Sequence, residues 1–291
     1  MLTIFSTPKP FRGHVCTTQR NAIQSWTRLD PGVEVILFGD DEGSAEVCRE
    51  FGIRHEPTVR RDDHGLKFLD YLFSRAQEIA GHSVLCYVNC DIMLMSDFRN
   101  AVLSVWKRFK TALMVGRRWD VDVTAPWDFH SADWECQLRR LVEMSGQQRP
   151  SQYIDYFAFN KGLFRQIPPL VIGRVAWDNW LVWKARSKGA PVIDASGAVT
   201  AVHQNHDYSY HPTGAFGVWH DDIARRNIEL AGGQRHYYTV ADATHTLQPQ
   251  GISYNWDRWR QAASKRPMLL ALFPLFRRCR GLVRKVVQSV S

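Results

Sequence analysis

Residues 84–91 read Val-Leu-Cys-Tyr-Val-Asn-Cys-Asp, an apolar run of five residues followed by an amide and a carboxylate. A short apolar run of this kind predicts a strand buried on both faces of a parallel sheet. Side chains two residues apart in extended chain point the same way, so we expect Asn89 and Asp91 to project to one side. Both offer oxygen ligands for Mg²⁺ or Mn²⁺, although Asn and Asp are also common in plain turns. A second apolar run, residues 92–95, follows, and a carboxylate between two such runs is costly to bury without a partner.

Strand and helix patterns alternate on both sides of this run. Further apolar runs predict strands over residues 2–6, 33–38 and 112–115. Helical spacing of apolar residues predicts helices from Thr17 or Thr18 to Leu29, over residues 45–51 and over residues 66–79. The repeated strand–helix–strand order predicts an α/β fold, a Rossmann-type and mostly parallel sheet flanked by helices.

The pattern becomes less regular beyond Gly116. We expect helices over residues 132–144 and 177–188, and short strands near residues 153–159 and 191–194. No linker separates the two patterns, so we expect residues 1–115 and 116–257 to form two halves of one domain. Residues 258–291 form a tail of different composition.

The net charge of +8 is concentrated in this tail. Nine basic and no acidic residues lie between Arg258 and Ser291, which leaves 28 basic against 29 acidic residues in the rest of the 291-residue chain. The body is therefore nearly neutral, and we expect no nucleic-acid partner. At 45% hydrophobic and 23% charged residues, the composition also excludes disorder.

The cysteines and the N-terminus indicate a reducing, cytoplasmic location. Six scattered cysteines form no CxxC pair, which disfavours a disulfide scaffold or zinc knuckle. The first residues lack the basic start and the long apolar region of a signal peptide. No apolar stretch reaches the roughly 20 residues that span a bilayer.

Polar residues follow three of the predicted strands. Phe5, Ser6 and Thr7 end the first strand, Asp40 and Asp41 follow the second, and Asp91 follows the central one. In an open parallel sheet, ligands bind beyond the carboxyl ends of the strands. The chain has no GxGxxG after the first strand and no GxxxxGK[ST], which disfavours a dinucleotide dehydrogenase or a P-loop enzyme.

The apolar strand that ends in the D-x-D-like triplet Asn89-Cys90-Asp91 resembles the GT-A glycosyltransferases. Residues 3–10 and 35–41 are also similar to bacterial sugar transferases of polysaccharide assembly, and the resemblance covers roughly residues 1–230. It implies a GT-A-like fold that transfers a sugar from a nucleoside-diphosphate donor, with residues 1–115 binding the nucleotide sugar and residues 116–257 the acceptor. It also implies that Asp91 binds a divalent cation on the diphosphate. Asn89 stands where the family has its first Asp.

The resemblance implies roles for further residues. The donor site would comprise Phe5, Ser6, Thr7, Asp40, Lys67, Asn89, Arg117 and Arg118. The acceptor site would comprise Asp155, Trp177 and Asn179, with Asp178 as the general base. Each has a structural alternative: helix capping for Asp178, surface charge for Lys67 and the arginines, and core packing for the tryptophans.

A polar cluster at residues 203–208, His-Gln-Asn-His-Asp-Tyr, follows an apolar run. By analogy with GT-A enzymes, His206 would complete the metal site, with His203 as the second choice. The order differs from HExxH, so a zinc hydrolase is disfavoured. Asp120 and Asp122 form an alternative carboxylate pair, which an exposed strand face would explain equally well.

The tail carries an amphipathic pattern. Apolar residues between Leu275 and Val287 fall on one helical face and arginines and lysines on the rest. We therefore expect a helix on an anionic membrane surface, holding the enzyme on the inner face of a membrane near a glycan or lipid-linked acceptor. Docking of the helix on the body is the alternative. A nucleotidyltransferase and a non-catalytic membrane-associated binding module are the competing functions.

Overall fold

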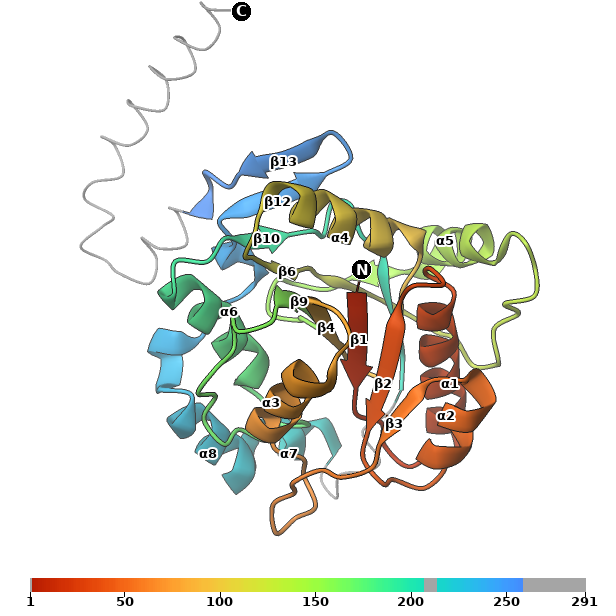
Figure 1. Ribbon diagram of the computed structural model, residues 1–291, viewed down its shortest axis with the longest axis horizontal. Coiled ribbons are helices and arrows are strands. Elements are labelled where there is room, and N and C mark those ends of the chain that lie inside the picture. The colour runs from red at the N-terminus through yellow and green to blue at the C-terminus, as the bar shows by residue number, and fades with distance from the viewer. Residues whose placement is uncertain (1, 207–213, 259–291) are drawn as a thin grey trace, which may run out of the picture.

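A nine-stranded sheet runs through the computed structural model, which describes residues 2–206 and 214–258 (Figure 1). Its strands are β1 (Leu2–Ser6), β2 (Glu34–Phe38), β3 (Arg54–Glu56), β4 (Val84–Val88), β6 (Leu113–Val115), β9 (Tyr156–Asn160), β10 (Val192–Asp194), β12 (His245–Gln248) and β13 (Gly251–Tyr254). Their spatial order is β13-β12-β10-β6-β9-β4-β1-β2-β3. Within the described residues, five of the eight strand pairings are parallel. The predicted α/β fold with a mostly parallel sheet is confirmed.

Strand β9 joins the two halves of the chain. It lies between β4 and β6 and is antiparallel to both. A strand from the second half therefore sits inside the sheet formed by the first half. This insertion places the residues that precede β9 beside those that follow β4, at the edge where ligands bind.

Helices cover both faces of the sheet (Figure 1). They are α1 (Gly13–Thr27), α2 (Ser44–Phe51), α3 (Leu69–Ile79), α4 (Ser96–Arg108), α5 (Trp134–Ser145), α6 (Trp177–Ser187), α7 (Gly214–His220) and α8 (Asp222–Leu230). Apolar residues of α1, α2 and α4 pack on one face, and those of α3 and α6 on the other. None of the helices within the described residues combines the length and apolar character that a bilayer crossing requires.

Helix α1 begins earlier than predicted. The expected cap at Thr17 or Thr18 is wrong, because Arg12 is the last extended residue and Cys16 N–H already donates to its carbonyl at 3.1 Å. The Thr18 hydroxyl instead donates to the Val15 carbonyl inside the helix. Helix α4 was not predicted from the sequence.

A second, four-stranded sheet begins a few residues after β4, at Ile92. Its order is β5 (Ile92–Met93), β11 (Ala201–Gln204), β7 (Arg118–Val121) and β8 (Gln147–Gln148). Strand β11 is antiparallel to β5 and parallel to β7. This sheet brings residues 201–206 next to Asp91. The predicted amphipathic helix over residues 275–287 lies outside the described residues.

A cluster of aromatic side chains packs between the sheet and α3. The Phe5 ring is fully buried and contacts Phe73, Tyr87 and Phe159, with ring centroids 5.2, 5.6 and 6.1 Å away. Sequence analysis placed Phe5 in the donor site. Because strand alternation points its ring into the core, only the backbone of Phe5 faces the end of the sheet.

We predict that Phe5→Ala lowers the free energy of unfolding by about 3–5 kcal/mol, because it leaves a cavity in a packed core. The matched control is Phe216→Ala, since the Phe216 side chain is 72% exposed, and its effect should stay within about 0.5 kcal/mol. Urea unfolding followed by circular dichroism measures both. Equal stabilities of the two variants would contradict this assignment of Phe5 to the core.

Candidate active site

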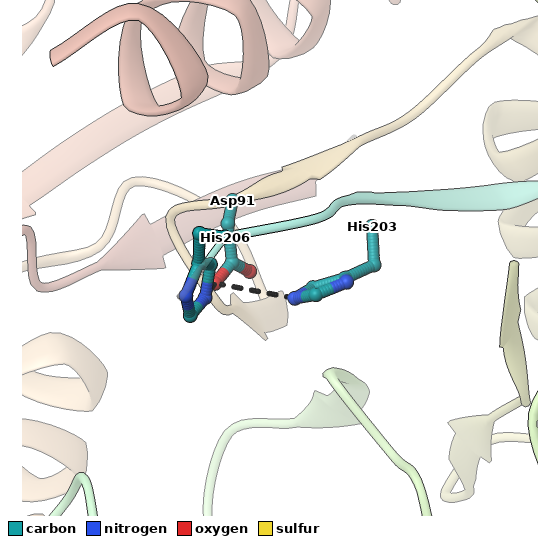
Figure 2. Close-up of side chains that lie close together, drawn as sticks. All are labelled: Asp91, His203 and His206. Carbon is teal, nitrogen blue, oxygen red and sulfur yellow. Dashed lines mark hydrogen bonds and ion pairs between the residues drawn. The ribbon is translucent and has the colours of Figure 1, made fainter. Parts of the chain in front are cut away.

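Asp91 and two histidines form a cluster at the carboxyl end of β4 (Figure 2). The Asp91 Oδ2 atom lies 3.2 Å from His206 Nε2 and 3.8 Å from His203 Nε2. One ligand atom from each residue lies within 4.8 Å of the others. The structure thus brings together Asp91, His206 and His203, the three residues that the sequence suggested for a metal.

The other oxygen of Asp91 is buried without a hydrogen-bond partner among the described residues. Burial raises the pKa of Asp91, but the imidazoles of His203 and His206 oppose this and hold that pKa well below its usual range. Asp91 is therefore ionised, and its Oδ1 atom accepts no hydrogen bond within the described residues. A buried, unpaired carboxylate oxygen beside two imidazoles fits a divalent cation.

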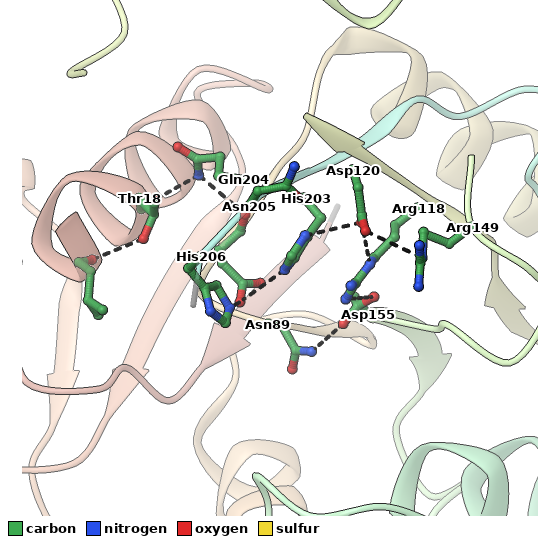
Figure 3. Close-up of polar contacts among 12 residues, drawn as sticks. Thr18, Asn89, Arg118, Asp120, Arg149, Asp155, His203, Gln204, Asn205 and His206 are labelled. Atoms are coloured by element: carbon green, nitrogen blue, oxygen red, sulfur yellow. Dashed lines mark hydrogen bonds and ion pairs between the residues drawn. The ribbon is translucent and has the colours of Figure 1, made fainter. Parts of the chain in front are cut away.

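The backbone fixes this cluster from both sides. In the ladders of β11, His203 is paired with Asp120 of β7 and with Ile92 of β5. The next residue, Gln204, is fully buried. Its backbone N–H donates to the Asp91 carbonyl at 3.2 Å, and its side chain donates to the Thr18 carbonyl at 2.7 Å. These two hydrogen bonds of Gln204 hold in place the backbone that carries His203 and His206 (Figure 3).

Asp120 lies close enough to His203 for an ion-pair contact. Its Oδ1 atom lies 3.1 Å from His203 Nδ1 and accepts a hydrogen bond from Arg118 Nε at 2.8 Å. This leaves Nε2 of His203 facing Asp91, the arrangement in which a carboxylate positions a metal-binding imidazole. Asp122, the other member of the alternative carboxylate pair, is exposed and accepts a hydrogen bond from Asn205 Nδ2 at 2.7 Å.

Asp155 connects the end of β4 to β7 (Figure 3). Asn89 Nδ2 donates to Asp155 Oδ1 at 2.5 Å, and Arg118 Nη1 donates to Asp155 Oδ2 at 3.1 Å. Asn89 is thus bound to Asp155, while Asp91 faces the histidines. Burial lowers the pKa of Arg118, but Asp155 and Asp120 raise it above its ordinary value, so Arg118 keeps its charge.

Asp178 stands in the first turn of α6. The position before the helix is Ala176, with a φ of 80° and no side-chain cap, so Asp178 is not the capping residue. Burial, followed by the nearby charge of Asp155, raises the pKa of Asp178 to about 7, although backbone N–H groups of the helix start oppose this rise. A carboxylate with this pKa can accept a proton at neutral pH.

The loops after β1 and β2 are tied together by charged groups. Lys67 Nζ lies 2.5 Å from Asp41 Oδ2 and donates to the Pro8 carbonyl at 2.6 Å. Arg61 Nη2 lies 2.7 Å from Asp40 Oδ1. Arg61 was not predicted from the sequence, since adjacent charged residues such as Arg60-Arg61-Asp62-Asp63 are common in polar loops and carry no specific signal.

Two predicted donor-site hydroxyls bind backbone carbonyls in the same region. The Ser6 hydroxyl donates to the Val88 carbonyl at 2.5 Å, and the Thr7 hydroxyl donates to the Phe38 carbonyl at 2.9 Å. These bonds join the ends of β1, β2 and β4. Both residues therefore shape the edge of the sheet where the predicted donor would bind.

Three predicted site residues lie elsewhere. Arg117 N–H donates to Ser196 Oγ at 2.7 Å, and its charge lies near Asp194. The Trp177 side chain is 5% exposed and meets Tyr87 edge-on at 5.4 Å. Asn179, 2% exposed, donates to the Tyr238 carbonyl. The prediction that Trp177 and Asn179 contact the acceptor is therefore corrected. Both side chains are buried and contact other residues of the protein.

The solved structures to which this chain is similar include three nucleotide complexes. The mannosyltransferase PcManGT from Pyrobaculum calidifontis, in complex with GDP-Man and Mn²⁺, is 15% identical, with 69% of this chain and 56% of that chain covered and a TM-score of 0.42. S. aureus TarS in complex with UDP-GlcNAc is 10% identical, with 70% and 59% covered and a TM-score of 0.46. Glucosyl-3-phosphoglycerate synthase from Mycobacterium tuberculosis, in complex with Mn²⁺, UDP and glucosyl-3-phosphoglycerate, is 11% identical, with 80% of each chain covered and a TM-score of 0.46.

The chain spans less than two thirds of the length of the first two of these structures. No family model matches the chain, and no curated protein matches it.

We predict that Asp120→Asn weakens Mn²⁺ binding about 10- to 100-fold, because it removes the charge that orients His203. Asp122→Asn is the matched control on the same segment and should bind Mn²⁺ like the unchanged protein. Asp91→Ala should bind no Mn²⁺ at this site. Electron paramagnetic resonance titration of free Mn²⁺ measures all three. Equal affinities of the Asp120 and Asp122 variants would rule out the orienting role.

Proposed function

We propose that this protein is a metal-assisted glycosyltransferase that moves a sugar from a nucleoside diphosphate to a hydroxyl group of a glycan or lipid-linked acceptor. One observation carries the proposal: Asp155 is joined through Arg118 and Asp120 to His203 of the Asp91–His203–His206 cluster. The charge of Asp155 also helps burial to raise the pKa of Asp178 to about 7. A cation can offset the charge of the diphosphate leaving group, and a separate base can take the proton of the acceptor hydroxyl.

The cluster would hold Mn²⁺ or Mg²⁺ through Asp91, His206 and His203. When bound, the cation offsets negative charge on the diphosphate leaving group. Two imidazoles favour Mn²⁺, because Mg²⁺ prefers oxygen ligands. The Asp91 Oδ1 atom would supply an anionic oxygen ligand for the cation, since it has no hydrogen-bond partner among the described residues. Lys67, Asp40 and the loop at Ser6 and Thr7 line the edge where the nucleotide part of the donor would lie.

Asp178 would take the proton of the acceptor hydroxyl. Burial and the charge of Asp155 keep its pKa near 7, so a substantial fraction is ionised at neutral pH and able to accept a proton. The oxygen of the acceptor then attacks the anomeric carbon, and the nucleoside diphosphate leaves. A single displacement of this kind inverts the anomeric configuration.

The competing functions fit these contacts less well. A nucleotidyltransferase that acts on a sugar phosphate has an anionic nucleophile and does not need a base with a pKa near 7. It would also use a glycine-rich basic loop after β1, whereas Arg12 there is paired with Glu42. A binding module needs no such base either.

The cellular location is proposed from the sequence alone. The amphipathic, basic pattern over residues 275–287 favours attachment of the tail to an anionic membrane surface. Attachment to the cytoplasmic face of a membrane would bring the enzyme to lipid-linked acceptors.

A panel of UDP- and GDP-sugars with MnCl₂ tests the proposed activity. We predict that Asp178→Asn lowers kcat 10²- to 10⁴-fold and leaves the donor KM within a few-fold, since it removes only the base. In the unchanged enzyme, the rate should fall about tenfold per pH unit below pH 7, as Asp178 becomes protonated. The control Asp222→Asn changes a carboxylate that is 90% exposed and should match the unchanged enzyme.

We also predict that Asp178→Asn changes how the melting temperature depends on pH. The folded-state pKa of Asp178, about 7, lies above its unfolded value of about 4. The stabilising contribution of the protonated form is therefore fully present below about pH 4 and is lost as pH rises to about 7. The melting temperature of Asp178→Asn should rise relative to the unchanged protein between about pH 4 and pH 7, and the difference should stay level above pH 7. Near-normal turnover in this variant, or a product with retained configuration, would contradict the assignment of the base.

A further inference from the structure

Arg149 directly follows β8 and lies close to the proposed metal site. Its backbone N–H donates to the Arg118 carbonyl at 2.9 Å, so the second sheet fixes its position. We propose that the Arg149 guanidinium binds an oxyanion of the acceptor, either a carboxylate or a phosphate group. This inference rests on the proposed function and names the chemical class of acceptor that the function leaves open.

The aromatic ring of Tyr153 holds the Arg149 side chain in place. The guanidinium carbon of Arg149 lies 4.4 Å from the ring centroid, and that of Arg118 lies 5.2 Å from it. Cation–π contacts of this kind stabilise a guanidinium against an aromatic ring. A guanidinium that is already held in one position loses less conformational entropy when it binds a ligand.

The two arginines beside Tyr153 differ in how their N–H groups are used. Arg118 is 9% exposed, and it donates to Asp120 Oδ1 at 2.8 Å and to Asp155 Oδ2 at 3.1 Å. The Arg149 side chain is 27% exposed. Its Nε atom is buried without a hydrogen-bond partner, and no hydrogen bond within the described residues uses its Nη1 or Nη2 atom. Arg118 is therefore held by the protein, whereas Arg149 has donors left for a ligand.

Asp120 does not use these donors. Its Oδ1 atom lies 2.8 Å from Arg118 Nε and 3.1 Å from His203 Nδ1, whereas its Oδ2 atom lies 3.4 Å from Arg149 Nε. The contact with Arg149 is thus the longest of the three, and it involves Nε rather than the Nη edge of the guanidinium. The two parallel N–H groups of an Nη edge match the two oxygens of a carboxylate or phosphate.

Asp120 and His203 separate Arg149 from the proposed cation. Figure 3 shows Arg149 and His203 on opposite sides of Asp120. The diphosphate of the donor would lie on the cation, at Asp91 and the Nε2 side of His203. An anion on Arg149 therefore belongs to the second substrate, the acceptor. An acidic sugar of a glycan and the phosphate of a lipid-linked sugar both supply such a group.

Saturation-transfer difference NMR tests this anion site without requiring turnover. The probes are methyl glucoside, methyl glucuronide and glucose 6-phosphate, each with excess EDTA and again with UDP or GDP and MgCl₂. We expect at least one anionic sugar to bind at least tenfold more tightly than the neutral glucoside in both conditions, because Arg149 is separate from the cation. Tighter binding of the glucuronide identifies a carboxylate, and tighter binding of glucose 6-phosphate identifies a phosphate group.

Arg149→Gln should weaken binding of the preferred anionic sugar at least tenfold, because it removes the charge and the paired N–H groups. Arg149→Lys keeps the charge but lacks the planar edge, and it should bind with intermediate affinity. Arg140→Gln is the matched control, since Arg140 is an exposed residue of α5 and the substitution removes the same charge. This control should bind like the unchanged protein, and circular dichroism checks that all variants fold.

Several outcomes would overturn the anion site. They are equal binding of the neutral and anionic sugars, no binding of either anionic sugar, and equal affinities of Arg149→Gln and Arg140→Gln. Binding of the anionic sugars only with MgCl₂ would also overturn it, because the anion would then lie on the cation. If Arg149→Gln does not fold, equal affinities of Arg149→Lys and Arg140→Gln contradict the proposal instead.

Donor consumption by the unchanged protein separates the two proposals. If nucleotide sugars are consumed but Arg149→Gln binds the anionic sugars normally, the anion site fails and the glycosyltransferase proposal stands. If no nucleotide sugar is bound or consumed, the proposed function fails, whether or not the anionic sugars bind.

Discussion

The arrangement of the site depends on the cost of burying the charge of Asp91. A buried carboxylate is destabilising unless other groups compensate it, and here Asp91 Oδ2 faces two imidazoles while Oδ1 has no partner among the described residues. The chain provides His203 and His206 through β11, which is held between β5 and β7. The second sheet can therefore be understood as the scaffold that brings compensating groups to the end of β4.

The antiparallel strand β9 has a similar role, because it positions Asp155. Because it enters the sheet between β4 and β6, the chain just before it delivers Asp155 to Asn89 and Arg118. Asp155 in turn raises the pKa of Asp178. The proposed metal site and the proposed base thus share one network of charges, and changes in one are expected to be felt by the other.

Local patterns in the sequence predicted the elements that are determined locally. The apolar runs became β1, β2, β4 and β6, and Asp91 was singled out because a carboxylate between two apolar runs needs a partner. Contacts set by long-range register could not be predicted. The pairing of Asp120 with His203 depends on the alignment of β7 with β11. The burial of Trp177 depends on which face of α6 meets the sheet, and its sequence environment resembled that of an exposed site.

Calorimetric titration of UDP and GDP into the protein, with MnCl₂ and with excess EDTA, tests the central claim most directly. If Asp91, His203 and His206 form a cation site for a diphosphate, at least one nucleotide will bind with MnCl₂ and at least tenfold more weakly with EDTA. Binding that is the same in both conditions would contradict the cation site. No binding of either nucleotide in either condition would contradict a site for a UDP- or GDP-linked donor.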